Sequence, residues 1–60
     1  MEFKSGQIWD INGKGYRYWG PYVRGSLALY GFVDIKTDWI LYKDAEYWNQ
    51  RVMRLIEDVP

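Results

Sequence analysis

The sequence predicts an α+β fold in which a four-stranded antiparallel meander precedes one C-terminal amphipathic helix. Three observations predict it. Apolar residues recur at helical spacing near the C-terminus, four short segments rich in β-branched and aromatic residues come before them, and the turns between those segments are short. Short turns favour pairing between strands that follow each other in the chain. A length of 60 residues allows one small domain, and we expect it to span residues 1–60.

Turn residues divide the first two thirds of the chain into expected strands. These strands cover residues 7–11, 16–19, 26–35 and 39–42. Asn12-Gly13 predicts a tight hairpin between the first two, because both residue types tolerate a positive φ. Gly20-Pro21 is expected to end the second strand, since proline has no amide hydrogen for a strand ladder. Residues 22–25 then form either a loop or a short continuation.

Residues 44–59 carry the helical pattern. At 100° per residue the apolar side chains fall within one arc, with polar residues on the rest of the circle. The members of that arc are Ala45, Trp48, Val52, Leu55, Ile56 and Val59. Asp44 is a suitable N-cap, and Glu46 in the first turn complements the helix dipole. We therefore predict a helix from Asp44 or Ala45 to about Asp58.

A second architecture stays open beside the first. In a small SH3-like barrel, residues 51–57 would form a last strand instead of the end of a helix. The regular helical arc favours the meander with a terminal helix.

The third expected strand is apolar on both faces. Leu27, Leu29, Val33 and Ile35 point one way with Gly31 among them, and Ala28, Tyr30 and Phe32 point the other way. We expect the helix to cover the Leu27 face, where Gly31 would admit its backbone. Tyr30 and Phe32 would then lie on an uncovered apolar face, of the kind that normally marks an interface. Three alternatives follow: a curled sheet in which both faces are core, a homodimer, or a site for another macromolecule.

Composition excludes several kinds of chemistry. The chain has no Cys and no His, so disulfides, thiol chemistry, imidazole catalysis and Cys/His metal sites are excluded. No cofactor, metal site or enzymatic activity is expected. The longest apolar stretch apart from glycine, residues 27–33, is far too short to span a membrane, and the N-terminus does not match a signal peptide. We therefore expect a cytoplasmic protein with no membrane partner.

Basic and aromatic residues alternate in one stretch, from Lys14 to Arg24. Aromatic platforms beside cations are typical of sheet surfaces that hold single-stranded nucleic acid. Phosphate binding usually needs a plainly basic surface, and the formal net charge of this chain is zero. Single-stranded nucleic-acid binding through Tyr16–Arg24 is therefore the alternative function.

The chain resembles, over its whole length, the small aromatic-rich phage proteins that block host proteins. The resemblance is carried by Gly6-Gln7-Ile8-Trp9, by Asn12-Gly13-Lys14-Gly15 and by Trp48-Asn49-Gln50-Arg51-Val52. It implies a non-enzymatic inhibitor that occupies a partner's surface in the host cytoplasm and that forms a homodimer. From the residues themselves we expect aromatic contact area with arginines at its rim. The expected partner-binding residues are Tyr16, Arg17, Tyr18, Trp19, Tyr22, Arg24, Tyr30 and Phe32.

Overall fold

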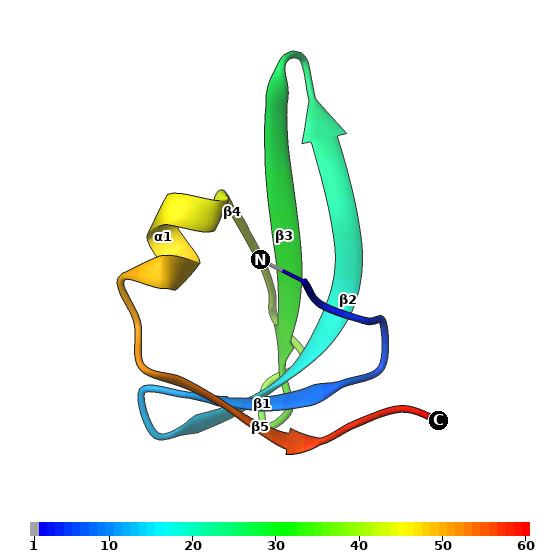
Figure 1. The fold of residues 1–60 in the computed structure, drawn as a ribbon, viewed down its shortest axis with the longest axis vertical. Helices are drawn as coiled ribbons and strands as arrows, with labels where there is room; N and C mark the ends of the chain where they lie inside the picture. Colours follow the sequence, from blue (N-terminus) through cyan, green and yellow to red (C-terminus); the bar gives the residue numbers. More distant parts are fainter. Residues whose placement is uncertain (1) are drawn as a thin grey trace.

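A computed structural model describes residues 2–60, which form five antiparallel strands and one short helix (Figure 1). The elements are β1 (Ile8–Ile11), β2 (Lys14–Arg24), β3 (Leu27–Asp34), β4 (Ile40–Lys43), α1 (Ala45–Asn49) and β5 (Met53–Glu57). Their order in the sheet is β4-β3-β2-β1-β5. The class prediction of an antiparallel sheet with one helix is confirmed, but the sheet has five strands rather than four.

Strand β2 joins the two halves of the sheet. Its first residues pair with β1, and from Tyr16 onward it pairs with β3 as far as Arg24. A register shift between Tyr18 and Gly20, with Gly20 at a φ of 151°, bends the strand between the two halves. Figure 1 shows the result, in which β1 and β5 run across the lower end of the long β2–β3 hairpin.

The prediction that Gly20-Pro21 ends the second strand is wrong. Pro21 lies within β2, opposite Tyr30 of β3. β1 pairs with β2 only as far as Arg17, so at Pro21 the strand has one strand neighbour instead of two. Proline is tolerated in such an edge segment because no second ladder needs its missing amide hydrogen.

The hairpin between β1 and β2 is confirmed. Ile11 pairs with Lys14, and Asn12 and Gly13 have φ values of 52° and 86°. Positive φ at both central residues defines the type of two-residue turn that Asn-Gly favours, because its twist matches that of the flanking strands.

The predicted long helix is wrong beyond its first turn and a half. The N-cap is confirmed, since Asp44 Oδ1 accepts a hydrogen bond of 2.9 Å from the amide of Tyr47, but the helix ends at Asn49. Residues 53–57 are extended and pair with β1, Leu55 lying opposite Trp9. Without β5, the free edge of β1 would leave backbone N–H and C=O groups unpaired. A short isolated helix is only marginally stable in water. Pairing with β1 therefore overrides the helical pattern of residues 53–57.

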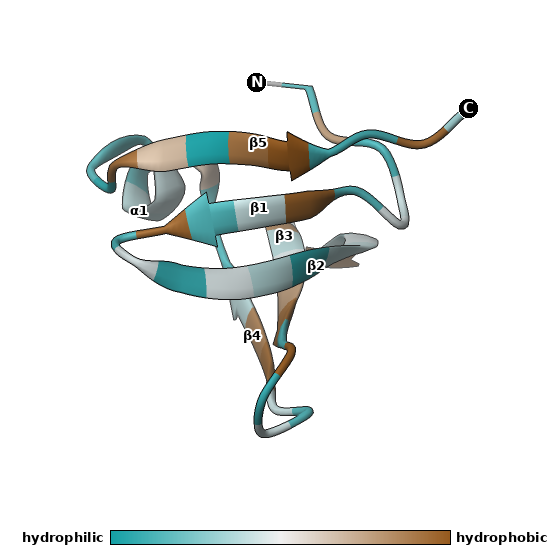
Figure 2. Cartoon of the chain, turned by 90° about the horizontal axis from the view of Figure 1, so that it is seen from below, coloured by the Kyte–Doolittle hydropathy of each residue, from teal (hydrophilic) through white to brown (hydrophobic). Residues whose placement is uncertain are grey.

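The last strand of the SH3-like alternative is therefore present. It covers residues 53–57, within the expected range of 51–57, and it follows a short helix. Figure 2 shows β5, β1 and the first part of β2 lying side by side, with β3 and β4 crossing behind them. β4 and β5 are not paired, so the described strands form an open sheet and not a closed barrel.

The core lies on the face of β3 that carries Phe32, which we call the inner face. Phe32 has no exposed surface and its ring centroid lies 4.5 Å from that of Trp48 in α1. The indole nitrogen of Trp48 donates to the carbonyls of Tyr30 and Lys43, both at 3.1 Å. Ile11 and Tyr18 are the other buried apolar residues among residues 2–60. α1 thus covers the face that the sequence analysis left open, and the expected placement of the helix is wrong.

The N-terminal segment completes the cover of the inner face. Phe3 places its ring within 5.0–5.6 Å of four others, those of Trp9, Tyr18, Tyr30 and Phe32. Buried Gln7 fixes this segment, because its side chain accepts from the Lys4 amide and the Trp9 indole and donates to Asp58. The sequence analysis missed Phe3 because it lies outside every expected element.

Candidate protein-binding surface

The opposite face of β2, β3 and β4 carries apolar side chains that no helix or strand covers. Residues directly opposite each other in antiparallel strands share a face, and so do alternate residues along one strand. The register therefore places on one face six apolar residues, which we call the outer patch: Tyr22, Leu27, Leu29, Val33, Ile40 and Tyr42. Four of them are among the exposed large apolar residues, and Leu29 and Val33 are half-buried.

Tyr42 is the central side chain of the outer patch. It pairs with Gly31, and a Cβ atom on Gly31 would lie 2.5 Å from the ring of Tyr42. The missing side chain of Gly31 therefore lets the ring lie flat over β3. Its far side reaches Tyr22 of β2, with the two ring centroids 5.2 Å apart. The expected role of Gly31, close approach of a helix backbone, is wrong, because an aromatic ring takes that space.

Two arginines flank the outer patch. Arg17 lies opposite Val33 and Arg24 lies opposite Leu27, so both belong to the outer face, and both are exposed. Trp19, 59% exposed, follows at the bend of β2, where Ser5 Oγ donates to its carbonyl. Four of the expected partner-binding residues, Arg17, Trp19, Tyr22 and Arg24, thus present exposed surface from β2.

The other four expected residues lie on the inner face. Phe32 is 0% exposed and Tyr18 is 3% exposed, so neither offers surface to a partner. Tyr16 and Tyr30 are half-buried and pack against the same core. The expectation that Tyr30 and Phe32 lie on an uncovered face is wrong, because Phe3 and Trp48 fill that space.

Burial also changes the chemistry of Tyr18. Removal from water, assisted by the neighbouring Tyr30, raises the pKa of the Tyr18 phenol above its ordinary value of 10.0. The Tyr18 ring packs against the rings of Phe3 and Phe32, which matches a structural role for this residue. It does not match the role of a stacking platform for bases.

The sequence analysis omitted the strand β4 residues from the candidate site. Ile40 and Tyr42 alternate with Leu41 along β4. Their alternation with Leu41 carried a usable signal, since Leu41 packs against the core while Ile40 and Tyr42 are exposed. The alternation does not indicate which of the two sets faces inward.

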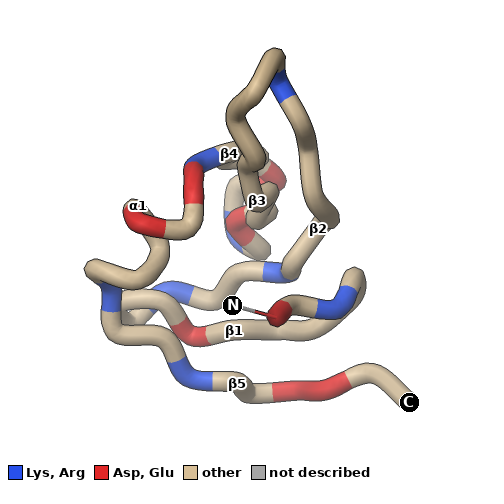
Figure 3. Tube along the Cα trace, turned by 45° about the horizontal axis from the view of Figure 1, so that its top comes forward, with Lys and Arg blue, Asp and Glu red and all other residues tan. Residues whose placement is uncertain are grey.

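Charges of both signs lie close together along the chain. Lys43 is followed by Asp44 and Glu46 in the sequence, and Figure 3 shows basic and acidic residues together between β4 and α1 and on β5. Arg54 of β5 lies 3.6 Å from Asp10 of β1. Backbone phosphates bind best to a continuous basic surface, so this mixture favours a protein partner over nucleic acid.

Among residues 2–60 no group of three or more Cys, His, Asp or Glu side chains has the spacing to hold a metal ion. No helix in the same range is long and apolar enough to cross a membrane. Comparison of the chain with protein-family models, with curated proteins and with solved structures gives no match. The outer patch is therefore interpreted on its own geometry.

Proposed function

We propose that this chain is a non-enzymatic protein-binding domain that docks on another protein through the outer patch. One observation supports the proposal above all others: six apolar side chains from three strands share one face, and no element of the described chain covers them. Uncovered apolar patches on small domains mark interaction sites, and tyrosines are favoured there for their large area and polar tip.

The charges around the outer patch favour an acidic partner. Arg17 and Arg24 of β2 flank the patch. A rim of this sign steers and orients a partner that carries carboxylates at matching positions. Such a domain acts by occupying its partner's surface, as the resemblance to phage inhibitors of host proteins implies, in the cytoplasm of a host cell.

Self-association remains part of the proposal, but through a sheet edge. β4 and β5 each pair on one side only, and an open strand edge is a template for a second chain. Sedimentation over a range of concentrations tests this, and a mass that stays at 7.3 kDa contradicts it.

The docking surface is tested by charge substitution at exposed positions. The double variant Tyr22→Glu, Leu27→Glu should remain folded and lose capture of the partner from a lysate of the organism that encodes the chain. Val52→Glu is the matched control, because Val52 is 79% exposed and lies outside the outer patch. Capture that survives the double variant, or that is lost equally in the control, contradicts the proposal. Binding of single-stranded oligonucleotide that weakens steeply with salt would favour the alternative function.

A further inference from the structure

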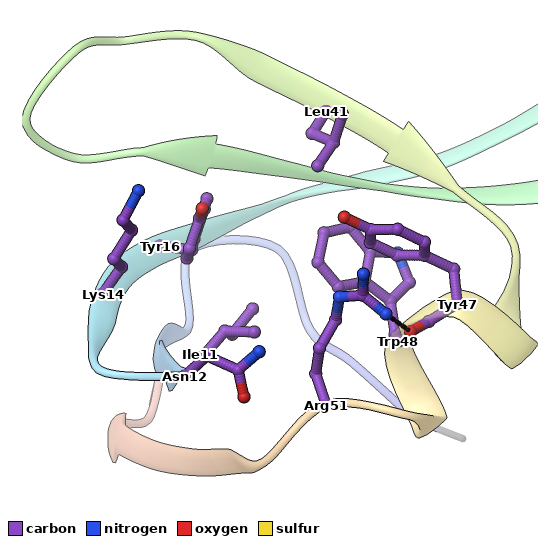
Figure 4. Close-up of a pocket in the computed structure, with 8 residues that line it drawn as sticks. All are labelled: Ile11, Asn12, Lys14, Tyr16, Leu41, Tyr47, Trp48 and Arg51. Atoms are coloured by element: carbon purple, nitrogen blue, oxygen red, sulfur yellow. Dashed lines mark hydrogen bonds between the residues drawn. The ribbon is translucent and has the colours of Figure 1, made fainter.

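The inner side of the edge strand β4 borders a pocket of about 270 Å³ that the proposed docking surface does not use. Its walls come from the β1–β2 turn, from β4, from α1 and from the segment before β5 (Figure 4). The lining residues are Ile11, Asn12, Lys14, Tyr16, Leu41, Tyr47, Trp48 and Arg51. Two of these residues are cationic and none is acidic.

Arg51 is held in place at the pocket wall. Its guanidinium carbon lies 3.5 Å from the centroid of the Tyr47 ring, and Nη1 donates to the Tyr47 carbonyl at 2.8 Å (Figure 4). The stacking on Tyr47 uses one face of the guanidinium, and the hydrogen bond uses one of its five donors. No carboxylate of residues 2–60 lies within 4 Å of Arg51. Its remaining donors therefore need an acceptor from water or from a ligand.

Asn12 adds a donor next to the two cations. Its side-chain oxygen accepts from the Val52 amide at 3.0 Å, and its backbone amide donates to the Val52 carbonyl at 3.0 Å. Because the oxygen is occupied in this way, the amide nitrogen is the end left to face the pocket, and Figure 4 shows it turned toward the space beside Arg51. Lys14 stands at the opposite wall and is likewise without a carboxylate partner among the described residues.

From this arrangement we propose that the pocket binds the carboxylate of an acidic side chain of the protein partner, an inference that rests on the proposed function. Two cations and an amide donor line this pocket, no acidic side chain is part of its wall, and such a set is complementary to an oxyanion. A guanidinium can meet a carboxylate with two parallel bonds. The volume is below the range of about 300–1,000 Å³ that is typical of drug-sized ligands, so it suits a single side chain.

The position of the pocket connects it with the outer patch. Leu41 lines the pocket, and its neighbours Ile40 and Tyr42 belong to the outer patch on the other face of β4. β4 has one strand neighbour, β3, so its other edge is open. A partner that rests on Tyr42 can therefore reach around that edge and insert a side chain into the pocket.

The test is an NMR titration of the full chain with a probe that carries one carboxylate, N-acetylglutamate N-methylamide, and with its neutral glutamine analogue. We expect the carboxylate probe to shift the side-chain signals of Arg51, Asn12 and Trp48 in a saturable way, at least tenfold more tightly than the glutamine analogue. Arg51→Gln should weaken binding at least tenfold, and so should Lys14→Gln, which leaves the stacking on Tyr47 intact.

Arg54→Gln is the matched control for loss of one positive charge, because Arg54 is exposed and lies on β5 outside the pocket. Equal shifts with the glutamine analogue, or equal weakening in Arg54→Gln, would overturn the proposal. Tenfold tighter saturation of the same signals by inorganic phosphate would overturn the assignment of a carboxylate. Failure here is distinct from failure of the docking surface, because the probe does not need Tyr22 or Leu27.

Discussion

The two faces of strand β3 carry similarly apolar residues but differ in how far the rest of the chain covers them. On the inner face Phe32 is fully enclosed by rings from the N-terminal segment, β2 and α1. On the outer face, Leu27 and Leu29 are similarly apolar, yet they lie opposite Arg24 and Tyr22 of β2, and Leu27 is 50% exposed. The comparison teaches that apolar character alone does not define a core. What defines it is which face the rest of the chain reaches.

The largest change in stability is expected when a side chain of the inner face is truncated. Phe32→Ala should cost about 3–5 kcal/mol, because it removes a ring that makes close contacts with three others and leaves a cavity. Leu27→Ala on the outer face should change stability by no more than about 0.5 kcal/mol. Urea denaturation followed by circular dichroism measures both. Similar losses in the two variants would show that the outer face is core as well.

A smaller effect is expected from Gly31→Ala, which changes the outer face without touching the core. The added Cβ would meet the Tyr42 ring at 2.5 Å, so the ring must swing off β3. We expect a cost of about 1–3 kcal/mol, as for other overpacked positions, and loss of the Tyr22–Tyr42 contact. Denaturation gives the cost and NMR cross-peaks between the two rings give the geometry. Cross-peaks that persist in the variant would contradict the position assigned to Tyr42.

The smallest expected effect is a pH dependence of the free energy of unfolding, and it comes from Tyr18 on the inner face. Because the pKa of Tyr18 is raised in the folded protein, its phenol stays neutral above pH 10.0 while that of the unfolded chain ionises. This contribution to stability is fully present below pH 10.0 and is lost as pH rises through the folded pKa. Denaturation between pH 8 and pH 11 should show a steeper decline for the wild type than for Tyr18→Phe. Equal slopes would contradict the burial of this phenol.

Strand positions could be predicted from the sequence, because turns leave local marks. Asn12-Gly13 fixed the first hairpin, and the expected strands at 7–11, 26–35 and 39–42 match β1, β3 and β4 to within one or two residues. Residues 53–57 could not be assigned correctly, since their apolar spacing suits a helix and their strand state depends on β1, which lies far away in the sequence. Long-range pairing of that kind leaves no local mark.

The candidate site was predicted in part for a related reason. Alternation sorted the β3 residues into the correct two sets, and the expected partner-binding residues Tyr22, Arg17 and Arg24 are exposed. The choice of covered face depended on Phe3 and on Trp48, whose positions follow from the bend at Gly20 and from the early end of α1. A helix that continued to about Asp58, as predicted, made it reasonable to expect that the Leu27 face of β3 is the covered one.

The pairing of β5 with β1 has a consequence for local opening. β5 pairs with the sheet along one edge only, and its partner strand lies at the other end of the chain, so its release breaks the pairing with β1 and leaves the β1–β4 meander paired. We expect its amide protons to exchange with solvent sooner than those of β2 and β3. A released β5 can also pair with β1 of a neighbouring molecule, which makes strand exchange a route to a swapped dimer at high concentration.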